Sequence, residues 1–110
     1  MPEAKVRCII KRPDEQYGHV TNISTSLKNL QRIVEGPIQM LPIGGNSVII
    51  CNEEGKLRGM LPNFIIGTPP LVDVVVGEAI VIGTEGEDLC DLPISFNLWK
   101  KILKGWGNYE

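Results

Sequence analysis

The stretch that decides the fold is Ile49–Asn63, IICNEEGKLRGMLPN, in which an apolar segment breaks into the densest polar cluster in the middle of the chain. Its apolar start is typical of a buried strand, and Glu53-Glu54-Gly55-Lys56 is typical of a turn. Gly59 and Pro62 both weaken sheet pairing, so we expect a short strand with an irregular continuation over Leu57–Ile66. The stretch therefore predicts a sheet that is interrupted by a polar loop.

The residues at the start of the chain predict a strand followed by a helix. Basic and apolar residues alternate over Ala4–Lys11, a period of two that is typical of a half-buried strand with one basic face. Tyr17–Ile23 is a short strand or an extended loop. From Leu27 the apolar residues recur at helical spacing behind a group of capping hydroxyls, and Gly36 followed by Pro37 ends this helix.

A hairpin leads into the central stretch. Pro37–Ile43 and Ser47–Asn52 are two predicted strands, and Gly44-Gly45-Asn46 between them tolerates the positive φ angles of a tight turn. After the central stretch, Leu71–Gly83 is apolar on both faces apart from two acids, which predicts central strands covered on both sides, with a bend at Gly77.

A second amphipathic helix is expected near the end of the chain. Its apolar positions recur from Ile94 to Trp106, Trp99 falls on the buried stripe, and three lysines complement the negative end of the helix dipole. The order strand, helix, about four strands, helix predicts an α+β fold, with a mostly antiparallel twisted sheet of about five strands and two helices packed on it. We expect residues 1–110 to form a single domain.

Composition restricts the setting. No apolar run approaches the roughly 20 residues that cross a bilayer, and the first residues lack the apolar region of a signal peptide, so we expect a cytoplasmic protein. The cysteines Cys8, Cys51 and Cys90 are far apart, which favours reduced, buried thiols over a thiolate metal site.

Charge is strongly segregated although the net charge is only −2. Residues 1–35 carry 6 Lys or Arg, whereas residues 72–92 carry 6 acidic residues and no basic one. We expect these regions to pair, either within one chain or between subunits, and on this ground we expect a homo-oligomer. A duplex nucleic acid is disfavoured as a partner, because phosphate binding needs a net basic surface.

The residues that catalysis requires are scarce. His19 is the only histidine, and no nucleophile elbow or HExxH motif accompanies it. The acidic residues of 85–91 lack the spacing of a calcium loop, and no glycine-rich phosphate loop is present. We therefore expect no catalytic residue, no metal site and no cofactor, which leaves binding rather than turnover.

The central polar cluster is the candidate binding surface. Its amides can recognise a base edge or sugar hydroxyls, and an arginine fork can bind a phosphate. The alternative is a polar turn whose charges pair with one another. The candidate ligand contacts are Asn52, Glu53, Lys56, Arg58 and Asn63, with Tyr17, His19 and Trp106 as stacking or rim residues.

The segments Leu27–Gly36, Asn52–Leu57 with Pro62-Asn63, and Asp73–Ala79 together resemble a small domain-of-unknown-function family, DUF3846, found in phages, mobile elements and Gram-positive bacteria. The resemblance covers about Val6 to Leu103 and implies no activity of its own. It does imply a phage setting, in which small proteins without catalytic equipment often act by occupying a target in the cytoplasm of the bacterial host.

The leading hypothesis is a non-enzymatic, phage-type anti-defence protein that sequesters a small anionic ligand, such as a nucleotide immune signal. The alternative is a protein-interaction domain that inhibits or recruits a host factor through its sheet edge or the tail around Trp106. A nucleotide-directed hydrolase ranks third. No membrane and no duplex nucleic acid is expected among the partners.

Overall fold

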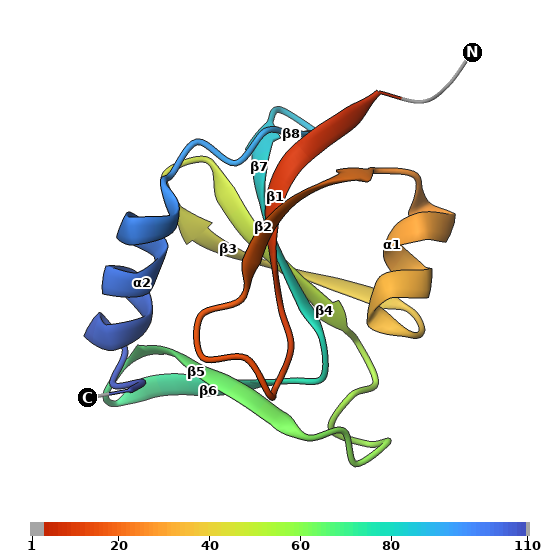
Figure 1. The fold of residues 1–110 in the computed structure, drawn as a ribbon. Coiled ribbons are helices and arrows are strands. Elements are labelled where there is room, and N and C mark those ends of the chain that lie inside the picture. The colour runs from red at the N-terminus through yellow and green to blue at the C-terminus, as the bar shows by residue number, and fades with distance from the viewer. Residues whose placement is uncertain (1–3, 110) are drawn as a thin grey trace.

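In the computed structural model, residues 4–109 are described, and most of them are arranged around one antiparallel sheet (Figure 1). The strand order is β2-β1-β7-β4-β3, and β8 pairs with the remaining part of β7. The strands of this sheet are β1 (Lys5–Lys11), β2 (His19–Ser24), β3 (Ile38–Gly44), β4 (Ser47–Asn52), β7 (Ala79–Glu85) and β8 (Asp88–Cys90). The central strand is thus β7, which comes late in the chain and joins the two earlier hairpins.

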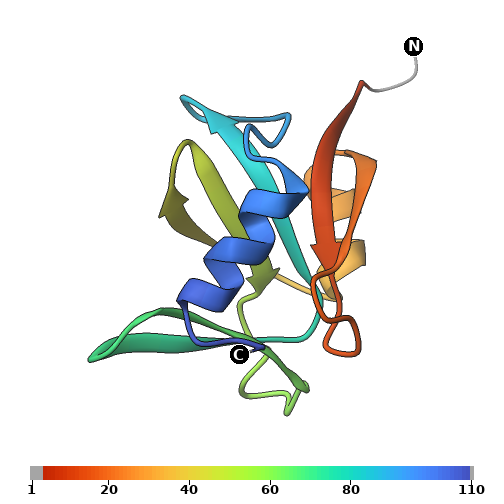
Figure 2. The same ribbon diagram turned by 60° about the vertical axis from the view of Figure 1, so that its left-hand side comes forward.

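The two helices cover opposite faces of this sheet (Figures 1 and 2). α1 (Leu27–Val34) packs with Cys8, Ile10 and their even-numbered neighbours in β4 and β7. α2 (Phe96–Gly105) packs with Ile9 and the odd-numbered residues of the same strands. Because successive side chains of a strand point to opposite faces, each central strand contributes to both cores.

Both helices begin at a serine cap. The hydroxyl of Ser26 accepts a hydrogen bond from the backbone N–H of Asn29 at 3.2 Å, and that of Ser95 accepts one from Leu98 at 3.1 Å. α1 ends at Val34, and its C-cap residue, Glu35, has a left-handed φ of 66°. Within the described residues, neither helix is long and apolar enough to cross a membrane.

A separate two-stranded sheet, β5 (Pro62–Thr68) with β6 (Leu71–Val76), packs beside α2 on the same side of the main sheet (Figure 2). Phe64 and Val75 anchor it in the core shared with Trp99, which is fully buried. Thr68 pairs with Leu71, so Pro69 and Pro70 form the turn at the tip of the β5–β6 hairpin. The peptide bond between these two prolines is cis.

The structure confirms the α+β class, both helices and the Gly44-Gly45-Asn46 turn, but it corrects three elements. The strand expected from Leu57 begins only at Pro62, because residues 53–59 form turns. β1 was expected to be half-buried with one basic face, but both of its faces are buried from Cys8 to Lys11.

Leu71–Gly83 was predicted to be covered on both sides throughout. Only the part from Ala79 onward is central, whereas Leu71 to Val74 of β6 are exposed. The chain passes from the hairpin into the main sheet at Gly77, whose φ of 73° allows the bend, so the apolar run is divided between two sheets.

Within the described residues, the expected pairing of the basic and acidic regions is seen in one ion pair and one backbone hydrogen bond. Arg12 forms an ion pair with Glu78 at 2.9 Å, and the carboxylate of Asp91 accepts a hydrogen bond from the backbone N–H of Arg7 at 2.8 Å.

The three cysteines are free, and burial raises the pKa of the Cys8 thiol to about 11. Buried, protonated thiols agree with the prediction for Cys8 and Cys51, which are both buried.

Candidate functional site

The polar stretch after β4 attaches its loop to the end of α1. The buried side chain of Asn52 donates from Nδ2 to the carbonyl of Val34 at 3.0 Å, and its Oδ1 accepts from the backbone N–H of Glu54 at 2.7 Å. Arg58 donates from Nη1 to the carbonyl of Glu35 at 2.6 Å. These groups therefore satisfy carbonyls at the end of a helix, where a cation also complements the helix dipole.

Gly36 makes this attachment possible. A Cβ at residue 36 would lie 2.8 Å from Nδ2 of Asn52 and 3.0 Å from Nη1 of Arg58, and the φ of 156° lies in a region that other residues rarely adopt. The glycine that was predicted to end the helix thus also lets the loop approach it.

Asn63 is directed away from the polar loop, into a buried contact with Lys11. Nζ of Lys11 donates to Oδ1 of Asn63 at 2.7 Å and to the carbonyl of Glu15 at 2.7 Å. Nδ2 of Asn63 donates to the carbonyls of Lys11 and Gly77, each at 2.7 Å. Because every polar atom of this amide has a protein partner, Asn63 connects the hairpin to the main sheet.

Lys11 is a residue that the sequence analysis did not single out. It is fully buried, and burial lowers the pKa of its amine to about 8, with Glu15 and Asp14 acting in the opposite direction. The alternation of β1 could have predicted this burial. Residue 11 lies on the same face of the strand as Ile9, and that face packs in the core formed with α2.

Lys56 and Asp73 form an ion pair that links the polar loop to β6. Nζ of Lys56 lies 2.5 Å from Oδ1 of Asp73, and both side chains are more than half exposed. The hydrogen bond from Lys56 is the largest influence on the Asp73 carboxyl, and together with the N–H of Val74 it lowers the pKa of that group. This pair lies at the junction of two hollows in the surface.

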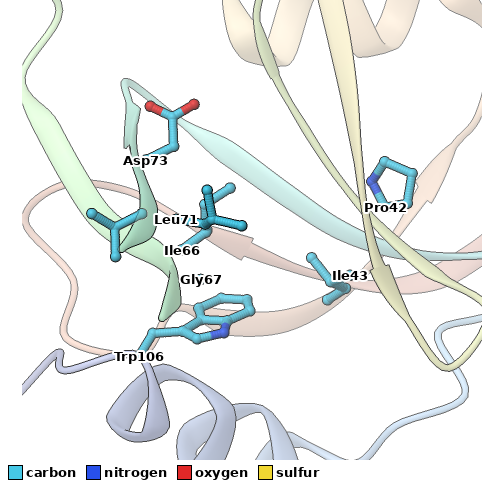
Figure 3. A pocket seen from close by; sticks show the side chains of 8 residues that line it. Pro42, Ile43, Ile66, Gly67, Leu71, Asp73 and Trp106 are labelled. Atoms are coloured by element: carbon cyan, nitrogen blue, oxygen red, sulfur yellow. The ribbon is translucent and has the colours of Figure 1, made fainter. Parts of the chain in front are cut away.

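The larger hollow has a volume of about 480 Å³ and opens between β3, the β5–β6 hairpin and the end of α2 (Figure 3). Trp106 forms one wall, and its ring stacks on Phe64 with centroids 6.5 Å apart and planes inclined by 6°. The lining residues are Pro42, Ile43, Ile66, Gly67, Leu71, Val72, Asp73 and Trp106. Apart from Asp73, its side chains offer apolar surface and one indole.

The smaller hollow, of about 100 Å³, continues from Asp73 toward the polar loop. Asn52, Glu53, Lys56 and Cys51 contribute to it. Burial raises the pKa of the Cys51 thiol, which keeps it in the less nucleophilic form. We call the two hollows together the β3–β6 groove, since these strands form its long sides.

The structure brings four of the eight candidate residues to this groove, namely Asn52, Glu53, Lys56 and Trp106. The other four make contacts elsewhere. Arg58 and Asn63 bind backbone carbonyls as described above, Nδ1 of His19 lies 2.9 Å from the carboxylate of Glu15, and Tyr17 packs against α2. The eight residues therefore do not form one continuous site.

The groove residues that sequence reasoning missed are mostly apolar. Ile43, Ile66 and Leu71 gave no signal distinct from that of core residues, whereas Asp73 is a charge within an otherwise apolar run and could have been singled out. Among residues 4–109, no group of three or more histidine, cysteine or acidic side chains is arranged to hold a metal ion.

Fold and groove together define a small α+β domain with an apolar, aromatic-walled hollow. The chain belongs to the family described as a domain of unknown function, DUF3846, whose model matches residues 6–104. The comparisons with curated proteins and with solved structures gave no match. Membership confirms the resemblance carried by the Asn52–Asn63 stretch, and the family description assigns no activity.

Proposed function

We propose that this protein is a non-enzymatic binding protein that sequesters a small anionic ligand with a planar ring, such as a nucleotide, in the β3–β6 groove. The observation that carries the proposal is the 480 Å³ hollow beside Trp106. Small-molecule sites are typically concave, largely apolar and about 300–1,000 Å³ in volume, with a few polar groups that orient the ligand. A ring would lie in the apolar part, and Asp73 and Lys56 would meet its polar groups.

Lys56 supports the anionic part of the proposal. Among residues 4–109 it is the only basic residue that lines either hollow, and its partner Asp73 is 55% exposed. Exposed ion pairs contribute only about 0–1 kcal/mol, so a phosphate, which carries more charge than a carboxylate, could displace Asp73 at little cost. The side chains of Asn52 and Glu53 lie farther along the same groove.

In the phage setting implied by the family resemblance, the ligand would be a nucleotide signal of bacterial immunity, captured in the cytoplasm of the host. This role needs affinity and abundance rather than turnover. It is consistent with a groove in which the thiol of Cys51 has a raised pKa and in which Asn52, Lys56 and Asp73 are held by contacts with the protein.

Two variants with matched controls test the site. Leu71→Glu places a carboxylate at the mouth of the larger hollow, where Leu71 is 85% exposed, and Lys56→Gln removes the cation. Leu57→Glu makes the same change at a leucine that is 91% exposed outside the groove lining, and Lys28→Gln removes an exposed cation on α1. We expect the groove variants to weaken binding by at least about tenfold and the controls to leave it unchanged.

Native mass spectrometry and calorimetry with linear, cyclic and ADP-ribose-type nucleotides provide the measurement. Absence of any bound species at micromolar ligand would refute the proposal. Equal loss of affinity in Leu57→Glu and Leu71→Glu would move the site out of the groove. Conversion of a nucleotide during incubation would identify an enzyme instead.

A protein-interaction domain is the second candidate, and exposed apolar side chains favour it. Leu57 and Leu61 in the polar loop are 91% and 70% exposed, and Leu71, Val72 and Val74 of β6 are exposed as well. The three on β6 lie close together along one strand, and contiguous exposed apolar residues often mark a protein contact. A stoichiometric partner that is captured from host lysate, is lost with Leu57→Glu and is insensitive to nucleotides would support this function over ligand capture.

A further inference from the structure

One side of α2 gathers lysine ammonium groups over aromatic rings. Nζ of Lys100 lies 5.3 Å from the ring centroid of Tyr17 and 5.3 Å from that of Phe96. Nζ of Lys104 lies 5.8 Å from the same Tyr17 centroid. Lys101, between them in the sequence, is exposed. We call these five residues the α2 basic face.

Several contacts fix the position of Tyr17, whose ring lies beneath the lysine ammonium groups of the α2 basic face. Its carbonyl accepts a hydrogen bond from the indole N–H of Trp99 at 2.9 Å, and its ring meets the edge of Tyr109 with centroids 5.6 Å apart. The side chain of Gln16 donates to its hydroxyl at 3.3 Å. A ring fixed in this way keeps the two ammonium groups close together on the surface.

These lysines have no acidic partner in the part of the chain that the structure describes. The ion pairs found there are Arg12–Glu78, His19–Glu15 and Lys56–Asp73. Among the described residues, only Arg12–Glu78 joins the basic start of the chain to the acidic segment, and the cations of α2 are among the charges that remain uncompensated. Like charges near one ring repel each other, and an anionic group placed beside them would relieve that repulsion.

The complementary charge is carried by the turn between β7 and β8. Glu85, Glu87 and Asp88 are exposed, and none of them takes part in an ion pair among residues 4–109. This turn lies at one end of the sheet, beyond the start of α2 (Figure 2). Each copy of the chain thus presents the α2 basic face and an acidic turn, neither of which is in an ion pair among the described residues.

We propose that a second copy of this chain docks its β7–β8 turn on the α2 basic face. The charges are opposite in sign and similar in number, which gives the contact its specificity and makes its strength depend on salt. A two-fold arrangement would form the contact twice. The rings of Tyr17 and Phe96 already have ammonium groups over them, so the face is less suited to stacking the bases of a single-stranded nucleic acid. The contact does not involve the β3–β6 groove and does not depend on the proposed ligand.

Charge exchange between the two surfaces tests the proposal. The acidic variant is Lys101→Glu/Lys104→Glu, and the basic variant is Glu85→Lys/Glu87→Lys; all four residues are exposed. The control is Lys28→Glu/Arg32→Glu, which makes the same change in charge at exposed residues of α1. Molar mass is measured by light scattering and sedimentation at about 100 µM protein, in low salt and in about 0.5 M salt, where surface charges are screened.

We expect the wild type and the α1 control to associate at low salt and to dissociate at high salt. Each charge variant alone should be monomeric, and an equimolar mixture of the acidic and basic variants should associate again. A monomeric wild type at low salt would overturn the proposal, even if acidic peptides or oligonucleotides bind α2. Loss of association in the α1 control to the same degree would also overturn it, because a general charge effect would then suffice.

Discussion

At the scale of single residues, the contact between Lys11 and Asn63 shows how a charge is kept inside this protein. The ammonium group donates to Asn63 and to the carbonyl of Glu15, and it lies 5.6 Å and 5.3 Å from the ring centroids of Phe64 and Tyr109. These partners replace part of the hydration that burial removes. One side chain thereby joins β1, the loop after it, β5 and the end of the chain.

Replacement of Lys11 by methionine is expected to destabilise the fold. Met has a similar length, but Oδ1 of Asn63 and the carbonyl of Glu15 would lose their donor, and buried unsatisfied acceptors cost about 1–3 kcal/mol each. We expect the free energy of unfolding to fall by about 2–4 kcal/mol in urea denaturation. Lys28→Met, at an exposed residue of α1, is the control and should change little. Equal stability of the two variants would contradict the structural role of Lys11.

At the scale of elements, the β5–β6 hairpin depends on contacts outside its own ladder, since an isolated two-stranded sheet is at best marginally stable in water. Asn108 provides one of these contacts. Its Oδ1 accepts from the backbone N–H of Ile65 at 2.9 Å, and its Nδ2 donates to the carbonyl of Ile65 at 2.8 Å and to that of Leu103 at 3.1 Å. The amide thus occupies the edge of β5 as a neighbouring strand would, and it joins that edge to α2.

Asn108→Ala is therefore expected to loosen the hairpin while leaving the main sheet intact. Hydrogen exchange should accelerate at the amides of residues 62–76, and the loss of these bonds should cost about 1–3 kcal/mol of local stability. Asn97→Ala, at an exposed residue of α2, serves as the control. Uniform acceleration throughout β1, β4 and β7 would show that the hairpin does not open separately.

At the scale of the whole molecule, two half-cores on opposite faces share the strands β1, β4 and β7. Ionisable groups buried in this arrangement make global stability depend on pH. The Lys11 amine has a pKa of about 8 in place of 10.5, whereas burial raises the pKa of Cys8 to about 11 from 9.0 and also raises those of Cys51 and Tyr109. The lowered pKa of Lys11 and the raised pKa values of the other groups therefore have opposite effects on how stability changes with pH.

The sign for Lys11 follows from proton linkage. Between about pH 8 and 10.5 the unfolded chain holds a proton at Lys11 that the folded chain has released, so a rise in pH favours folding through this residue. Cys8, Cys51 and Tyr109 stay protonated in the folded chain above their ordinary pKa, so they oppose this trend. We expect the stability of Lys11→Met, relative to wild type, to decline from pH 7 to 10.5 in urea midpoints. A constant difference across this range would contradict the lowered pKa of Lys11.

The elements of this fold could be predicted largely from local pattern. Alternation predicted β1, capping hydroxyls and helical spacing predicted α1, helical spacing and the lysines of its last turn predicted α2, and Gly44-Gly45-Asn46 predicted the β3–β4 turn. For the candidate site the sequence was less informative. It predicted Lys56 and Trp106 as ligand contacts, and both line the groove. It predicted Arg58 and Asn63 equally, but in the structure their side chains donate hydrogen bonds to backbone carbonyls. A side chain's hydrogen-bond partners are set by segments distant in sequence, which no local pattern encodes.

The sequence by itself determined where most strands and both helices lie and which stripe of each helix is apolar, because these follow from periodicity and turn chemistry within a few residues. Tertiary structure alone decided that Leu71–Val76 pairs with β5 outside the main sheet, that Lys11 is buried, and that β3, β6 and Trp106 enclose a groove. Each of these depends on the packing of elements that are far apart in the chain. Ile49–Asn63 therefore predicted where the sheet would be interrupted, while the groove beside it exists only once the hairpin has packed across that interruption.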